Sequence, residues 1–165
     1  GEAPAGVERA GTPEAADFAL TLTPEGGALH LVPPIGVLGV GCRRGTTAER
    51  LEEAFSAFCA SSGLSPAAVS AAASIDLKKE EPGLAQFCEA HGWPITFYSA
   101  DQLRAVPGQF TPSAFVAGVT GVDNVCERAA AKASGGALLL PKTAGGGVTL
   151  ALAVRPFAPD WRTEQ

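Results

Sequence analysis

Two segments of the sequence place cations among residues that could bind an anion. The first is GCRRGTT over 41–47, in which Arg43 and Arg44 stand between Gly41 and Gly45. An arginine side chain presents a planar fork of donors that suits a carboxylate or a phosphate, and glycines let the backbone approach a ligand closely. The spacing fits neither of the glycine-rich nucleotide motifs, so it does not indicate a nucleotide site. Two interpretations remain: an anion site, or two solvated arginines on a turn.

The second segment, DLKKE over 76–80, combines acids with lysines and contains the candidate catalytic residues Asp76, Lys78 and Glu80. A carboxylate at the mouth of a site can act as a general base, and a lysine can stabilise a developing oxyanion. The alternative is a pair of acids at the start of a helix, with lysines that only contact solvent.

Cysteine and histidine chemistry has less support. Cys42 lies beside the two arginines and ahead of a predicted helix, an environment expected to favour its thiolate. A nucleophile also needs a positioned base, and neither His30 nor His91 can be assigned to that role. The cysteines at 42, 59, 88 and 126 show no C-x-x-C spacing, so we expect no metal site and no disulfide framework. A reducing, cytoplasmic location is the matching expectation.

The composition indicates what kind of molecule must position these residues. The chain has 165 residues, 46% of them hydrophobic and 18% charged, which is enough for one domain with a proper core. No apolar run is long enough to span a membrane, and a net charge of −5 argues against a nucleic-acid binder. Residues 1–34 hold five acids and one base, so the remainder is nearly neutral.

Strands and helices are predicted to alternate from residue 35 onward. Near-continuous or alternating apolar runs indicate strands over 35–41, 74–77 and 94–99. The first helix should bury a stripe of Leu51, Ala54, Phe55, Phe58 and Cys59, with a capping box formed by Thr46 and Glu49. A second helix is expected to begin at Ser65–Pro66, and a third to carry the stripe Leu84, Phe87, Cys88 and His91 up to Gly92. Three more are expected: one that begins at the capping box of Ser99 and Gln102, one over 113–119, and one that begins at Asp123.

The chain should end with two apolar strands over 137–154, joined by a glycine-rich turn. The alternation predicts an α/β fold: a three-layer βαβ domain with a largely parallel sheet and an antiparallel C-terminal edge hairpin. Glu127 falls close to the core stripe of the helix that begins at Asp123, so a partner is expected for it, such as Arg128 or a loop arginine.

Changes in composition suggest where the domain begins and ends. Residues 1–15 are rich in Pro, Gly and Glu and are expected to be a flexible linker. Two short alternating runs around 24–27 predict a hairpin over 16–34, which could be the end of a preceding domain. The α/β domain should then cover 35–157, with a tail over 158–165. Because the chain contains no Met, we expect it to be an excerpted or processed piece.

Ligands of open α/β sheets bind beyond the carboxyl ends of the strands, where loops lead into helices. Four segments are expected to meet there: 41–47, 76–80, the turn at Ser99, and Lys142–Thr143, which we place beyond the last parallel strand. The first two bring cations next to the starts of helices, which favours anion binding.

Four blocks, in this order, carry a family resemblance: GVGCRRGTTAERLEEAF (39–55), ASIDLKKEEPGLAQF (73–87), TPSAFVAGVTGVDNVCERAA (111–130) and LLLPKTAGGGVTLALAV (138–154). Together they resemble the C-terminal domain of cobalamin-biosynthesis protein G, which also occurs alone as cobalamin-biosynthesis protein E. The resemblance covers about 35–155 and implies a corrin-ring intermediate as ligand. Full-length members of the G family open the δ-lactone of cobalt-precorrin-5A and release acetaldehyde.

For a ligand of this class, the chemistry of the residues suggests a role for each candidate. Asp76, Lys78 and Glu80 would serve the hydrolysis, and the substrate would be bound by Gly41, Cys42, Arg43, Arg44, Gly45, Thr46, Ser113, Lys142 and Thr143. No cofactor is expected, because cobalt would arrive within the substrate. Partners would be a precorrin or cobalt-precorrin, the missing N-terminal domains and other enzymes of the pathway, with neither nucleic acid nor membrane.

Three classes of function stay open: a component of a hydrolase acting on a corrin lactone, a non-catalytic domain that binds or carries a corrin intermediate, and an α/β domain with an unrelated small ligand. Whether the isolated chain is an enzyme is therefore left undecided. The family's N-terminal domain is absent from this sequence.

Overall fold

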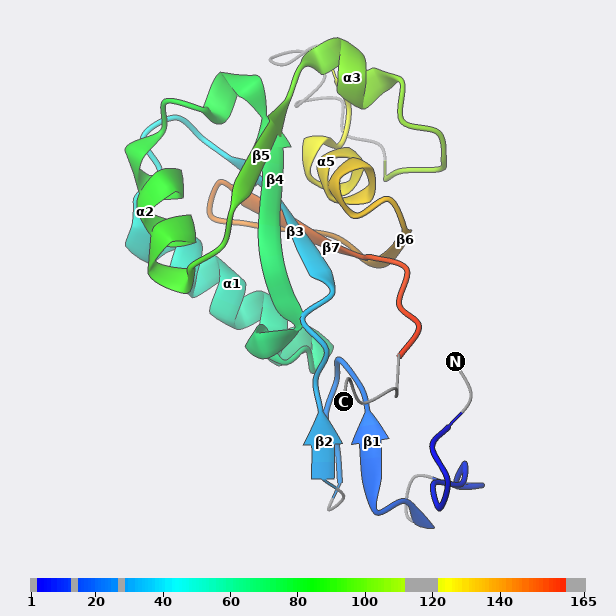
Figure 1. Ribbon diagram of the computed structural model, residues 1–165. Helices are drawn as coiled ribbons and strands as arrows, with labels where there is room; N and C mark the ends of the chain where they lie inside the picture. The colour runs from blue at the N-terminus through cyan, green and yellow to red at the C-terminus, as the bar shows by residue number, and fades with distance from the viewer. Residues whose placement is uncertain (1–2, 13–14, 27–28, 112–121, 160–165) are drawn as a thin grey trace.

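The computed structural model describes residues 3–12, 15–26, 29–111 and 122–159 of the chain (Figure 1). Its main body is a five-stranded sheet in the order β5-β4-β3-β7-β6, and a separate pair of strands, β1 and β2, lies outside it. The strands are β1 (Phe18–Leu20), β2 (Leu29–Leu31), β3 (Gly36–Cys42), β4 (Val69–Ile75), β5 (Ile95–Tyr98), β6 (Ala137–Gly145) and β7 (Val148–Val154). The α-helices among the described residues are α1 (Ala48–Ser62), α2 (Pro82–His91), α3 (Ala100–Arg104) and α5 (Val125–Ser134).

The sheet is mixed, as expected. Strands β3, β4 and β5 pair in parallel, whereas β7 runs antiparallel to β3 and pairs with the edge strand β6. The central strand β3 is buried from Gly36 to Val40, which explains its near-continuous apolar sequence. The predicted α/β class, with an antiparallel C-terminal hairpin at one edge, is confirmed.

Helices cover both faces of the sheet, which gives the predicted three layers (Figure 1). On one face α1 and α2 bury Leu51, Phe55 and Phe87 against β3, β4 and β7. On the other face α5 packs on β3 so closely that a Cβ on Gly39 would lie 1.8 Å from the carbonyl oxygen of Cys126. Among the described residues, no helix is long and apolar enough to cross a membrane.

The two N-terminal strands differ from the predicted hairpin. β1 and β2 pair in parallel, with Phe18 opposite Leu29 and Leu20 opposite Leu31, so the prediction of an antiparallel hairpin over 16–34 is wrong. Leu22 nevertheless packs against the core below α1, and its carbonyl accepts the backbone N–H of Ser65 at 2.8 Å.

Two helix starts also differ from expectation. Thr47, not Thr46, caps α1 by accepting the N–H of Arg50, and no capping box forms with Glu49. The helix predicted from Ser65 is only a 3₁₀ turn, Pro66–Ala68, followed at once by β4. Consequently the strand predicted over 74–77 begins earlier, at Val69, and ends at Ile75. The capping box of Ser99 and Gln102 is confirmed at α3.

Candidate functional site

The carboxyl ends of β3, β4 and β5 meet at one edge of the sheet, as the parallel pairing requires. The segment after β3 is the loop 43–47, the segment after β4 is a 3₁₀ turn, Asp76–Lys78, and Ser99 follows β5. The turn between β6 and β7 lies at the same edge, because Val148 pairs with Cys42 at the end of β3. The first two predicted loops are thus neighbours.

Glu81 joins the loop after β3 to the loop after β4. One carboxylate oxygen accepts the backbone N–H of Gly45 at 2.8 Å, and the other lies 3.7 Å from Nζ of Lys78. The start of α2 also abuts this loop, since a Cβ on Gly83 would lie 2.1 Å from the carbonyl oxygen of Thr46. A mostly buried acid therefore fixes the backbone of the loop that carries the arginines.

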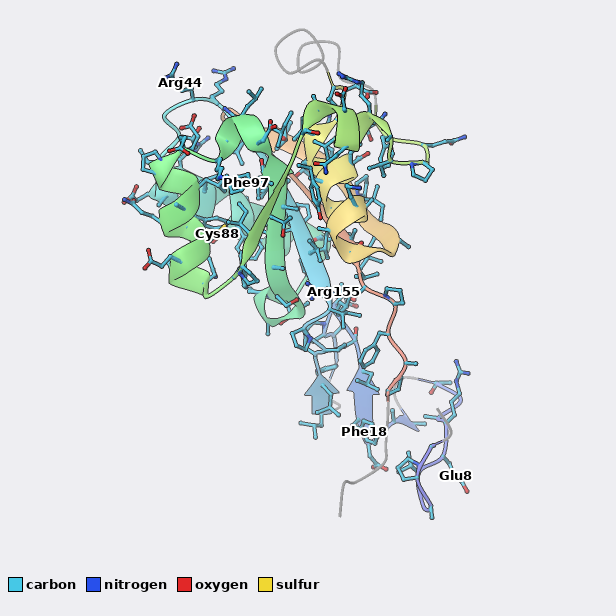
Figure 2. All side chains as sticks on the ribbon, turned by 45° about the horizontal axis from the view of Figure 1, so that its top comes forward. Glu8, Phe18, Arg44, Cys88, Phe97 and Arg155 are labelled. Atoms are coloured by element: carbon cyan, nitrogen blue, oxygen red, sulfur yellow. The ribbon has the colours of Figure 1, made fainter. Side chains whose placement is uncertain are left out.

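Arg43 and Arg44 are exposed, and neither forms an ion pair with an acid among the described residues. The backbone N–H of Arg43 donates to the carbonyl of Gly147 at 3.0 Å, which ties the loop to the β6–β7 turn. Arg44 lies at the rim of the loop and points away from the body of the molecule (Figure 2). Two free guanidinium groups on a fixed loop can bind carboxylates with charge-assisted hydrogen bonds.

Cys42 is half-buried at the end of β3. Burial raises the pKa of its thiol above the ordinary value, although the nearby Lys78 ammonium offsets part of this effect. The expectation of a favoured thiolate is therefore wrong, and the thiol is protonated at neutral pH. A nucleophilic role for Cys42 has no support in this environment.

The three candidate catalytic residues lie in different surroundings. Asp76 and Glu80 are exposed, whereas Lys78 is mostly buried and paired with Glu81. Lys78 is consequently held in place at the edge, as an electrostatic role would require. The roles of Asp76, Lys78 and Glu80 stay predictions.

Lys142 and Thr143 do not lie in a loop beyond a parallel strand. Both belong to the antiparallel edge strand β6, where Thr143 pairs with Leu150, so the predicted placement is wrong. The backbone N–H of Lys142 is held by Glu127 at 2.6 Å. Ser113 and the helix predicted over 113–119 lie outside the described residues.

The partners of Glu127 differ from those expected from the sequence. It is fully buried, yet its partner is neither Arg128, which pairs with Asp123, nor a loop arginine. Its carboxylate accepts the N–H and hydroxyl of Thr111, both at 2.9 Å, and the N–H of Lys142. Asn124, which caps α5, donates from its side chain to the carbonyl of Thr111 at 2.8 Å.

This cluster therefore links the segment before α5 to β6. An Asn with a Glu three residues later is a recognised signal of a helix start, and it indicates the cap at Asn124 rather than at Asp123. Within the described ranges, no group of three or more His, Cys, Asp or Glu side chains could hold a metal ion.

Comparison with known proteins agrees with this architecture. A cobalt-precorrin-5A hydrolase of Priestia megaterium is 36% identical over 134 residues, which cover 81% of this chain but only 35% of the relative. Protein CobE of a Sinorhizobium species is 33% identical over 120 residues, or 71% of this chain and 78% of the relative. This chain thus spans about a third of the length of the hydrolase and most of the length of CobE.

The crystal structure of CobE, a protein from the cobalamin biosynthetic pathway, superposes with a TM-score of 0.66 at 35% identity. The match covers 74% of this chain and 92% of the CobE chain. The family described as "Cobalamin synthesis G C-terminus" matches residues 36–153, which is most of the chain and contains the whole five-stranded sheet except the last residue of β7. The chain therefore belongs to the cobalamin synthesis G C-terminus family.

Proposed function

We propose that this chain binds a corrin-ring intermediate through the acid side chains of the ring, as the C-terminal domain of a cobalt-precorrin-5A hydrolase. The observation that carries the proposal is the pair Arg43 and Arg44, exposed and without an acid partner among the described residues, on a loop fixed by Glu81 and Gly147. Relatives named as cobalt-precorrin-5A hydrolase and as CobE support the corrin class.

Corrin precursors carry several acetate and propionate side chains around the ring. Such a ligand needs several cations on one surface of an otherwise nearly neutral protein. Arg43 and Arg44 supply fork-shaped donors, and Lys78, which is paired with Glu81, lies close to the same loop. Backbone fixed before binding lowers the cost of ordering the loop when the ligand arrives.

Opening of a lactone requires water to attack the ring carbonyl, with a base to take the proton and a donor to stabilise the oxyanion. Asp76 and Glu80 are the proposed bases, since both are exposed near the end of β4. Lys78 is the proposed oxyanion donor. Cobalt would enter as part of the substrate, and no cofactor of the protein's own is proposed.

A non-catalytic role in binding or carrying the intermediate is the second candidate. It is favoured by the match to CobE, because this chain covers 78% of that protein but only 35% of the hydrolase. A domain of this kind thus accounts for most of one relative.

The test is a titration followed by the absorbance of the corrin. Cobyrinic acid carries free carboxylates, whereas cobinamide has the same ring with its side chains as amides. We expect the chain to bind cobyrinic acid at least about tenfold more tightly than cobinamide, because charge-assisted hydrogen bonds are lost in the amide. Equal affinities, or no binding of either ligand, would contradict the proposal.

A further inference from the structure

A groove of about 340 Å³ lies between α1 and the end of the β6–β7 hairpin. Its apolar surface comes from Ala54, Ala57 and Phe58 of α1 and from Val148 and Leu150 of β7. The groove is hollow because the residues around it are small: alanines line the helix side, and Thr143–Gly146 line the hairpin side. The proposed function does not involve the residues of this groove.

Arg50 forms one end of the groove and is held there from two sides. Its guanidinium donates to Glu53 at 2.7 Å, one turn further along α1. It also lies against the backbone of Gly146, where an added Cβ would be 1.6 Å from a guanidinium nitrogen. Gly146 has φ +57, a left-handed conformation in which a larger residue would be strained. The side chain of Arg50 is still 47% exposed and can bind a further anion.

The β6–β7 turn at the end of the groove also contacts the loop that carries the arginine pair. The side chain of Arg43 lies against Gly147, the next residue of the same turn, with an added Cβ 2.9 Å from its Cδ. The backbone N–H of Arg43 also donates to the carbonyl of Gly147. Arg43 and Arg50 therefore lie on consecutive glycines, one beside the loop and one beside the apolar groove.

The hollow has an apolar floor, Arg50 and its partner Glu53 line one end of it, and Arg43 lies on the adjoining glycine of the turn. This arrangement suits an amphipathic ligand with a hydrocarbon edge and a carboxylate that the exposed part of Arg50 can bind. Pockets that enclose a whole drug-sized ligand measure about 300–1,000 Å³. The groove is at the lower end of this range, so it can take one edge of a large ring but not the entire ring.

We propose that this groove is a subsite for the alkyl-bearing edge of the corrin macrocycle, with Arg50 binding a carboxylate at its rim. This inference rests on the proposed function, because it concerns the same ligand at the same end of the sheet. It adds Ala54, Ala57 and Arg50 as residues that determine which ring edge fits.

The experiment fills the groove and measures the affinity for cobyrinic acid. In Ala57→Leu the new side chain occupies the groove, and affinity should fall about tenfold or more, as expected when a hydrophobic pocket loses space for its ligand. The matched control is Ala60→Leu, on the same helix, also exposed and outside the groove, which should bind as the unmodified chain does. Thr143→Leu fills the groove from the opposite wall and should reproduce the loss if Ala57→Leu does not fold.

The outcomes separate this inference from the proposed function. If the unmodified chain binds cobyrinic acid and both filled variants bind equally well, the groove is not a subsite and the inference is overturned, while the proposed function stands. If the unmodified chain does not bind cobyrinic acid at all, the proposed function itself fails. A loss confined to Ala57→Leu and Thr143→Leu, with Ala60→Leu unaffected, supports the inference.

Discussion

The described arginines fall into two groups, those with an acid partner and those without one, and the pair at the sheet edge belongs to the second group. Arg50, Arg104 and Arg128 each pair with a carboxylate. Arg43 and Arg44 pair with no acid in the described part of the chain, although Glu81 is mostly buried only one loop away. Glu81 instead accepts the N–H of Gly45, so it orders the loop without neutralising its cations.

The first prediction concerns these two side chains. Arg43→Gln and Arg44→Gln should each weaken binding of cobyrinic acid by about 10- to 100-fold, because each removes a charge-assisted hydrogen bond. Arg9→Gln is the control, since it removes the same charge from an exposed site in the N-terminal segment. Unchanged affinity in both variants at low ionic strength would remove the arginine pair from the site.

A second prediction concerns the stability that Glu127 provides. Glu127→Ala leaves two backbone N–H groups and one hydroxyl without their acceptor, so the free energy of unfolding should fall by about 3 kcal/mol or more. Glu53→Ala removes an exposed acid of α1 and should cost less than about 1 kcal/mol. Urea unfolding of both variants checks this, and similar losses would show that the buried cluster contributes little.

A third prediction follows from the buried thiols. Burial raises the pKa of Cys88 from 9.0 to about 11. The folded state therefore keeps its proton when the unfolded chain loses it, and the stability present below about pH 9 is lost as pH rises towards 11. Between about pH 8 and pH 11, the free energy of unfolding should fall by about 2 kcal/mol more in the unmodified chain than in Cys88→Ala. Equal falls would mean that Cys88 is not protected from solvent.

At the scale of elements, amphipathic patterns were a reliable guide and alanine-rich segments were not. The stripes of α1 and α2 were predictable because their apolar residues recur at helical spacing and lie against one sheet face. The run VSAAASI forms β4, although alanine favours helices, because small side chains fit a central strand covered by helices on both faces. Packing against distant segments determines that this run forms a strand, and a local sequence pattern carries no information about that packing.

The residues of the site were likewise only partly predictable from the sequence. Sequence reasoning could place Arg43, Arg44 and Asp76 near the ends of strands, since the strands themselves were recognisable. It could not foresee that Lys142 and Thr143 lie within β6, because the strand's length depends on its pairing with β7. Nor could it foresee that Glu127 binds Thr111 across a long separation in sequence.

The fourth prediction concerns the N-terminal strand pair. A chain that starts at Ile35 should still melt cooperatively, because β1 and β2 pair only with each other. Its free energy of unfolding should fall by about 1–3 kcal/mol, since Leu22 and Val32 pack against the core below α1 and would be lost. Thermal melts followed by circular dichroism check this. A molten or insoluble product would show that the pair is an integral part of the domain.

At the scale of the whole molecule, binding and turnover make different demands on a domain that matches only part of a hydrolase. Several carboxylate contacts can be made by the loops of one sheet edge, each of them with some tolerance in position. Hydrolysis needs water, base and oxyanion donor to be held together, and a displacement of about 1 Å can cost 100-fold in rate. The Priestia megaterium hydrolase is matched over 35% of its length, so the match leaves out most of that protein.

The last prediction is therefore that the chain binds the corrin ligand but hydrolyses the lactone of cobalt-precorrin-5A slowly. Acetaldehyde release should be at least about 100-fold slower than with the Priestia megaterium hydrolase, measured at saturating substrate so that affinity does not contribute. Asp76→Asn should then change the residual rate little, because the exposed carboxylate has no enclosed water to activate. A comparable turnover number for chain and hydrolase, with a large loss in Asp76→Asn, would instead make this domain the catalytic one.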